Sequence, residues 1–194
     1  MEVSAVRHDI IVIGASAGGI QALQILVAVL PDDLPAALFI VQHIPASEPS
    51  TLPRILSRSG PLPAFHATED LVIEQRKIYV APPNHHLLIE KGYMHLGTGP
   101  KERYARPAVD VLFRSAATAY GPRVVGILLT GMGRDGTAGL LAVKQHGGVI
   151  IVQDPKEARW PSMPQSAVEH MEVDYIAPLL SIASLLILLV QPVS

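Results

Sequence analysis

The chain has 194 residues, 49% of them hydrophobic, and a formal net charge of −2 at pH 7. A near-neutral chain lacks the basic surface that nucleic-acid binding requires, so we exclude that class of function. The absence of cysteine excludes disulfides and thiol catalysis. This size and apolar content predict a single domain over residues 1–194. No secretory signal pattern opens the sequence, and we expect a cytoplasmic protein.

A serine lies between the first predicted strand and the first predicted helix. Residues 10–13 are an apolar run typical of a buried strand, and apolar residues recur at helical spacing from Ile20 to Leu30. The turn between them, Gly14-Ala15-Ser16-Ala17-Gly18, fits the G-x-S-x-G pattern that exposes a nucleophile. The next helix would direct free N–H groups toward the same point, which suits an oxyanion. Taken alone, Ser16 fits a helix N-cap better than a nucleophile.

The next predicted strand, residues 37–41, ends just before His43. Three short β patterns follow at residues 77–81, 87–90 and 93–96, separated by turns that contain proline or glycine. These patterns predict a short antiparallel insertion.

Helical spacing returns from Asp110 to Tyr120, with Asp110 in the first turn, where a carboxylate stabilises the helix dipole. Apolar runs at residues 124–129 and 149–152 predict two more buried strands. The uncharged run at residues 176–190 is shorter than the roughly 20 residues of a spanning helix. We expect it to pack on the domain without membrane insertion.

The alternation of strands and helices predicts the fold class. We expect an α/β protein with a doubly wound, mainly parallel sheet, helices on both faces and a short antiparallel hairpin insertion. In such sheets, functional groups gather at the carboxyl ends of the strands. Ser16, His43 and Asp135 each follow a predicted strand. We therefore predict a catalytic triad in which Ser16 attacks, His43 transfers the proton and Asp135 orients the imidazole.

Two other function classes compete with this interpretation. Gly131-x-Gly133-x-x-Gly136 matches a dinucleotide fingerprint, and Asp154 follows the next strand. Against that alternative, Asp135 lies inside the turn, where its carboxylate would repel a pyrophosphate. A catalytically idle scaffold that binds a partner is the second alternative.

The order of the three residues also separates this chain from the ordinary α/β-hydrolases. Those enzymes place serine, acid and histidine in that order after several strands, whereas here the order is serine, histidine, aspartate after one strand. The paired His85 and His86 have no partner ligands at metal-site spacing, and we expect no metal.

The chain resembles the catalytic domain of the CheB protein-glutamate methylesterase family of bacterial chemotaxis. The resemblance covers most of the chain. Five segments carry it: Ile13-Gly14-Ala15-Ser16-Ala17-Gly18-Gly19, Gln42-His43-Ile44-Pro45, Tyr79-Val80-Ala81-Pro82, Arg106-Pro107-Ala108-Val109-Asp110-Val111-Leu112-Phe113 and Leu129-Thr130-Gly131-Met132-Gly133-Arg134-Asp135-Gly136.

The resemblance implies a serine hydrolase that removes methyl groups from glutamate γ-methyl esters on the cytoplasmic helices of methyl-accepting chemoreceptors. Deamidation of receptor glutamines is a related activity of the family. The family's triad falls on Ser16, His43 and Asp135, and the N–H of Met132, with that of Ala17, would form the oxyanion hole. No metal or organic cofactor is implied.

Some features depart from the family. Family members commonly carry a receiver domain ahead of the esterase; we expect none in this chain, and a separate response-regulator receiver is one possible activator. Ala17 stands where the family often has threonine, and Ser162 stands where it usually has glycine before Met-Pro.

A basic segment precedes the helix that begins near Asp110. It contains Lys101, Arg103 and Arg106. Receptor methylation helices are rich in carboxylates, so we predict that Arg103 and Arg106 bind substrate. The alternative is a solvated loop.

Overall fold

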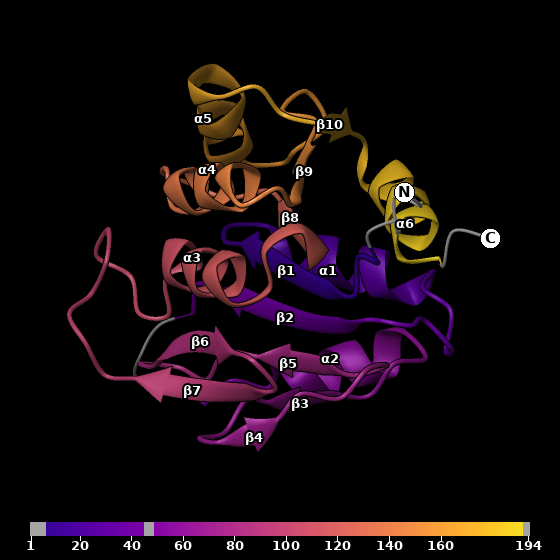
Figure 1. Ribbon diagram of the computed structural model, residues 1–194. Helices are drawn as coiled ribbons and strands as arrows, with labels where there is room; N and C mark the ends of the chain where they lie inside the picture. Colours follow the sequence, from indigo (N-terminus) through magenta and orange to yellow (C-terminus); the bar gives the residue numbers. More distant parts are fainter. Residues whose placement is uncertain (1–6, 45–48, 192–194) are drawn as a thin grey trace, which may run out of the picture.

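The computed structural model describes residues 7–44 and 49–191. A seven-stranded sheet runs through the centre of the molecule in the order β10-β9-β8-β1-β2-β5-β3, and every pair of neighbours is parallel (Figure 1). All residues of its central strand β1 are buried, as expected for an apolar strand covered on both faces. The strands are β1 (Ile10–Ala15), β2 (Ala37–Gln42), β3 (Ala64–His66), β5 (Ile78–Val80), β8 (Val124–Leu128), β9 (Val149–Gln153) and β10 (Tyr175–Ala177).

Helices cover both faces of this sheet. Successive residues of β1 belong to different core clusters: Ile11 and Ile13 to one, Ile10 and Val12 to the other. The first cluster includes residues of α1 (Gly19–Ala28), α2 (Leu52–Ser59) and α6 (Leu179–Val190). The second includes residues of α3 (Val109–Tyr120), α4 (Thr137–Gln145) and α5 (Ser162–His170), and a 3-10 turn, η1 (Gly121–Arg123), joins α3 to β8. The predicted doubly wound fold is thus confirmed.

A small antiparallel sheet lies beside α3, in the order β4-β7-β6 (Figure 1). It consists of β4 (Leu71–Val72), β6 (His86–Glu90) and β7 (Tyr93–Gly97). The predicted insertion is therefore present, but residues 77–81 were wrongly assigned to it. Their strand β5 pairs in parallel with β2 and β3 of the main sheet. Because all three residues of β5 are buried, the strand suits the interior of a parallel sheet.

The predicted C-terminal helix packs on the domain. Residue 176 belongs to β10, and α6 begins only after Pro178. Five residues of α6 are buried in the core cluster that contains α1. Among the described helices, none combines the length and apolar character needed to cross a membrane.

Two leucines of α6 provide a matched test of this packing. Leu186 is completely buried, whereas the side chain of Leu188 is 67% exposed. Leu186→Ala should lower the free energy of unfolding by about 2–5 kcal/mol, because it leaves a cavity in the core. Leu188→Ala should change it by about 0.5 kcal/mol or less. Urea denaturation of both variants measures the difference, and equal effects would contradict the placement of α6.

Candidate active site

The structure brings Ser16, His43 and Asp135 together at one edge of the main sheet. Ser16 follows β1 directly and His43 follows β2, while Asp135 lies in the connection from β8 to α4. Since β1 pairs with both β2 and β8, the carboxyl ends of these strands are neighbours.

A chain of hydrogen bonds joins the three side chains. Nδ1 of His43 lies 3.2 Å from Oγ of Ser16, and Nε2 of His43 lies 2.8 Å from Oδ2 of Asp135. An ionised carboxylate only accepts hydrogen bonds, so Asp135 selects the tautomer with the proton on Nε2. Nδ1 then carries the lone pair that can accept the hydroxyl proton of Ser16.

Asp135 is held by backbone groups as well as by His43. Its Oδ2 accepts the N–H of Val109 at 2.7 Å and its Oδ1 accepts the N–H of Asp110 at 2.9 Å. Burial alone would raise the pKa of Asp135, but the hydrogen bonds from His43 and from these two N–H groups lower it below its ordinary value. The carboxylate is therefore charged at neutral pH and can stabilise an imidazolium.

The helix-cap interpretation of Ser16 does not describe the structure. Helix α1 begins at Gly19 with Gly18 as its N-cap, without a side-chain capping bond, so Ser16 does not cap it. Asp135 caps α3, which begins at Val109, whereas α4 has Gly136 as its N-cap.

Gln42, the last residue of β2, connects Ser16 and His43, the predicted nucleophile and base. Its Nε2 donates to the carbonyl oxygens of Ser16 at 2.9 Å and His43 at 3.1 Å. The side chain thereby ties together the two segments that carry the reacting groups. Sequence reasoning missed this residue, because an amide at a strand end has no chemical pattern of its own.

The loop that carries Met132 packs against the nucleophile. A Cβ atom on Gly131 would come 2.8 Å from Cβ of Ser16, so only glycine allows this approach. Gly131 donates its N–H to the carbonyl of Trp160 at 2.9 Å, and Gly133 donates its N–H to Oγ of Ser162 at 3.1 Å.

Ser162 also donates to the carbonyl oxygen of Gly131 at 3.2 Å, and the N–H of Met163 donates to the same oxygen at 3.0 Å. These bonds fix the peptide plane whose other end is the N–H of Met132. Within residues 7–44 and 49–191, no group accepts a hydrogen bond from the N–H of Met132 or Ala17.

A pocket of about 480 Å³ adjoins the triad, with His43, Asp135 and Met132 in its wall. The rest of the wall is rich in cationic side chains, which make the local potential more positive. These basic residues are Lys101, Arg103, Arg106 and Arg134.

The two arginines predicted to bind substrate also have partners in the protein. Nε of Arg103 donates to Oδ2 of Asp110 at 3.0 Å. The guanidinium of Arg106 donates to Oδ1 of Asn84 and to the carbonyls of residues 98 and 99, at 2.7–3.1 Å. Arg106 thus holds its own loop together.

The helix start predicted as an alternative phosphate site already binds a carboxylate. The N–H groups of Gly136 and Gly139 donate to Asp110, and Asp135 lies at the same point. A pyrophosphate would have to displace one carboxylate and approach another. The dinucleotide alternative is therefore not supported.

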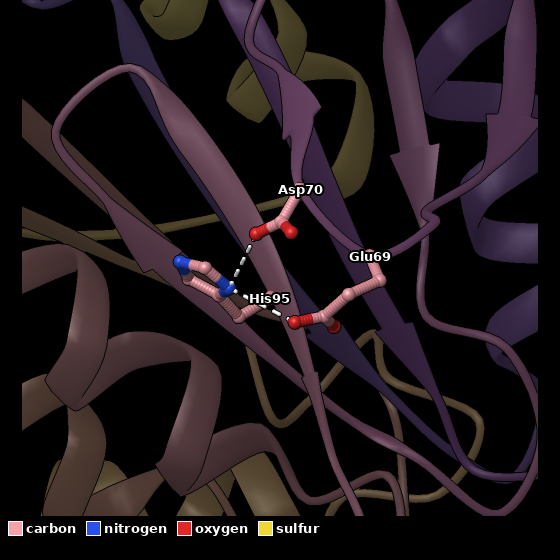
Figure 2. Close-up of side chains that lie close together, drawn as sticks. All are labelled: Glu69, Asp70 and His95. Carbon is pink, nitrogen blue, oxygen red and sulfur yellow. Dashed lines mark hydrogen bonds and ion pairs between the residues drawn. The ribbon is translucent and has the colours of Figure 1, made fainter.

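A second group of ionisable side chains lies on the small antiparallel sheet, outside the triad. Figure 2 shows the carboxylates of Glu69 and Asp70 directed at the same ring nitrogen of His95, Nδ1. Their oxygens lie 3.1 and 3.2 Å from this nitrogen. Glu90 lies 3.4 Å from Nε2. The hydrogen bond with Glu69 raises the pKa of His95 above its ordinary value, and the charges of Glu90 and Asp70 act in the same direction.

The chain is similar to the proteins of one known family over nearly its whole length. The CheB methylesterase family matches residues 11–186. A protein of Leptospira interrogans, provisionally named a protein-glutamate methylesterase/protein-glutamine glutaminase, is 41% identical over 95% of this chain and 96% of its own length. A Methanosarcina mazei protein with the name protein-glutamate methylesterase/protein-glutamine glutaminase 2 is 36% identical over 98% of this chain, which spans 54% of that relative.

A solved structure shows the same fold. The crystal structure of the Thermotoga maritima CheB methylesterase catalytic domain superposes with a TM-score of 0.90 and 34% sequence identity, over 95% of this chain and all of that one. The chain is an α/β protein with a parallel sheet. Ser16 at the end of β1 and the hydrogen-bonded pair His43–Asp135 are the side chains that a serine hydrolase uses. More particularly, the chain belongs to the CheB methylesterase family.

The environment of His95 predicts its titration. Its pKa should lie above the ordinary value of 6.5, and Glu69→Gln should lower it because the main hydrogen bond loses its charge. The raised pKa contributes stability that is complete below pH 6.5 and is lost as the pH rises through the raised pKa. Histidine proton resonances followed against pH measure both values. A wild-type pKa of His95 at or below 6.5 would contradict the arrangement in Figure 2.

Proposed function

We propose that this chain is a protein-glutamate methylesterase that acts on the cytoplasmic helices of methyl-accepting chemoreceptors. It would hydrolyse glutamate γ-methyl esters to glutamate and methanol, and deamidate receptor glutamines to glutamate and ammonia. The observation that carries the proposal is the hydrogen-bonded chain from Ser16 through His43 to Asp135, in a member of the CheB methylesterase family. We place the reaction in the cytoplasm, where those receptor helices lie.

The geometry supports a covalent mechanism in two stages. Nδ1 of His43 removes the hydroxyl proton of Ser16 as Oγ attacks the ester carbonyl carbon. Asp135 stays ionised and stabilises the imidazolium through the bond to Nε2. The protonated His43 then gives its proton to the departing methoxide, which leaves as methanol, and the glutamyl group remains esterified to Oγ.

Water completes the cycle by the same route. His43 removes one proton from water as the oxygen attacks the acyl group, and gives that proton to Oγ of Ser16 as the acyl–serine bond breaks. The product leaves as the carboxylic acid and loses its remaining proton to solvent, which gives glutamate. For glutamine, the first leaving group is ammonia. Neither stage, as proposed, requires a cofactor.

The N–H groups of Met132 and Ala17 are proposed as the oxyanion hole. Two observations support this assignment: the Met132 loop packs against Ser16, and bonds on both sides of Met132 fix the direction of its N–H. A donor fixed before the reaction stabilises developing negative charge without the cost of reorganisation.

The basic pocket beside the triad is proposed to receive the acidic neighbours of the reacting glutamate. Arg103 and Arg106 are our predicted contacts, although each also holds a protein group. Lys101 and Arg134 line the same pocket and offer further cationic groups to a receptor helix. Charge complementarity of this kind accelerates association and weakens with salt.

Replacement of the nucleophile tests the proposed reaction. Ser16→Ala should lower kcat for methanol release from methylated receptor by about 10⁶-fold, because the triad acts as a unit. Ser184, an exposed serine of α6, provides the control, and Ser184→Ala should leave kcat unchanged. Near wild-type activity in Ser16→Ala would rule out the mechanism. If the wild-type protein binds the receptor but releases no methanol, the result would instead favour the catalytically idle scaffold.

Two pocket cations, Lys101 and Arg134, bind neither Asp110 nor the carbonyl groups of residues 98 and 99, so their neutralisation tests substrate docking. The double variant Lys101→Gln/Arg134→Gln should raise KM for methylated receptor about 3- to 10-fold at low ionic strength, with kcat retained. Its KM should also depend less on salt than that of the wild type. Lys91→Gln, in a turn outside this pocket, is the matched control. An unchanged KM and salt dependence would exclude Lys101 and Arg134 as docking contacts and leave the esterase proposal intact.

A further inference from the structure

The carboxylate of Asp110 is buried next to the triad but takes no part in the proposed proton transfers. Asp110 is 2% exposed. Its Oδ1 accepts the N–H of Gly136 at 3.0 Å and the N–H of Gly139 at 2.7 Å. Its Oδ2 accepts Nε–H of Arg103 at 3.0 Å. Every carboxylate oxygen therefore has a donor, as burial of a charge requires.

Asp110 and Asp135 exchange helix caps. Asp110 lies in the first turn of α3, but its carboxylate binds N–H groups at the start of α4. Asp135 lies just before α4, but its carboxylate binds the N–H groups of Val109 and Asp110 at the start of α3. Helix starts leave such N–H groups without partners inside the helix. Each carboxylate thus caps the helix that begins beside the other.

The exchange fixes the direction of the Asp135 carboxylate. The two N–H groups of α3 bind different oxygens of Asp135, which sets the plane of the carboxylate, and Oδ2 then faces Nε2 of His43. The plane can remain in place only if α3 and α4 keep their relative position. Gly139 allows their close contact, because a Cβ atom there would lie 2.6 Å from Cβ of Phe113.

We propose that Asp110 is a positioning residue for the triad: by binding the N–H groups of Gly136 and Gly139, it holds the backbone beside Asp135 and so keeps the Asp135 carboxylate against His43. Its effect on catalysis rests on the proposed function, whereas its effect on the His43–Asp135 hydrogen bond does not.

The charges around Asp110 support this role. Burial raises the pKa of Asp110, and the neighbouring charge of Asp135 adds to the increase, while the bonds from Gly139 and Arg103 oppose it. Arg103 therefore offsets part of the repulsion that two adjacent carboxylates would otherwise suffer.

The test is Asp110→Asn in the full chain. The amide keeps the shape of the side chain and one acceptor oxygen, but its NH₂ group must face either Arg103 or the α4 N–H groups, all of which are donors. At least one of the three bonds is therefore lost. We expect kcat for methanol release to fall about 10- to 100-fold with KM unchanged, as for a small displacement of a reacting group.

A spectroscopic readout tests the position of His43 without any substrate. The Nε2 proton of His43, bound to Asp135, should give a downfield proton resonance in water that disappears in His43→Gln. In Asp110→Asn this resonance should move upfield or broaden. If the wild type proves to lack esterase activity, the proposed function fails while this measurement still decides the positioning role.

Asp9→Asn is the matched control. Asp9 is likewise buried, at 5% exposed, and its carboxylate accepts two N–H groups of Arg123 at 2.8 Å, but it directly precedes β1, at the edge of the sheet opposite the triad. It should lower thermal stability and leave both kcat and the His43 resonance unchanged. If Asp110→Asn does the same, Asp110 is structural only and the proposal is overturned.

If Asp110→Asn does not fold, the variant Arg103→Gln is tested in its place. This variant removes the cation bound to Oδ2 and leaves the Asp110 carboxylate in place. Because Arg103 is also a proposed substrate contact, the His43 resonance, measured without substrate, decides this test, and it should change in the same direction to a smaller extent. An unchanged resonance in the folded variant would overturn the proposal.

Discussion

The hydrogen bonds to the Asp135 carboxylate are the interaction on which the site depends. Three donors converge on it: two backbone N–H groups that begin α3 and the imidazole of His43. They keep the acid charged in a buried place, select the imidazole tautomer and leave Nδ1 facing Ser16. The parallel sheet supplies the coarse placement of the residues, and this carboxylate supplies the fine orientation. The carboxylate of Asp135 is thus bound both to the fold, through the start of α3, and to His43 of the triad.

Features governed by local pattern could be predicted from the sequence. The buried strands of the main sheet are strongly apolar, so their ends, and with them Ser16 and His43, could be placed. β5 was assigned to the wrong sheet because a three-residue strand shows no period, and only its pairing with β2 and β3 reveals its position. The short strands β3, β4 and β10 escaped prediction for the same reason.

Features governed by tertiary contact could not be predicted. The sequence suggested that Asp110 stabilises the dipole of its own helix, whereas its carboxylate caps α4, a choice that depends on how closely α3 and α4 approach. Likewise, a run of basic residues cannot show that Arg106 is bound to carbonyls of its own loop. Gln42 became recognisable only when two carbonyl oxygens were found beside it.

The bonds from Trp160 and Ser162 to the Met132 loop have a consequence for motion. They connect the loop to Trp160, in the segment between β9 and α5, and to Ser162, the first residue of α5, and both of these residues are exposed. Peripheral segments of this kind open locally at a lower free energy than the core. If Met132 is the oxyanion donor, as proposed, then this donor and Ser16 belong to regions of different local stability, and a local opening of the Met132 loop would stop the reaction while the sheet stays folded.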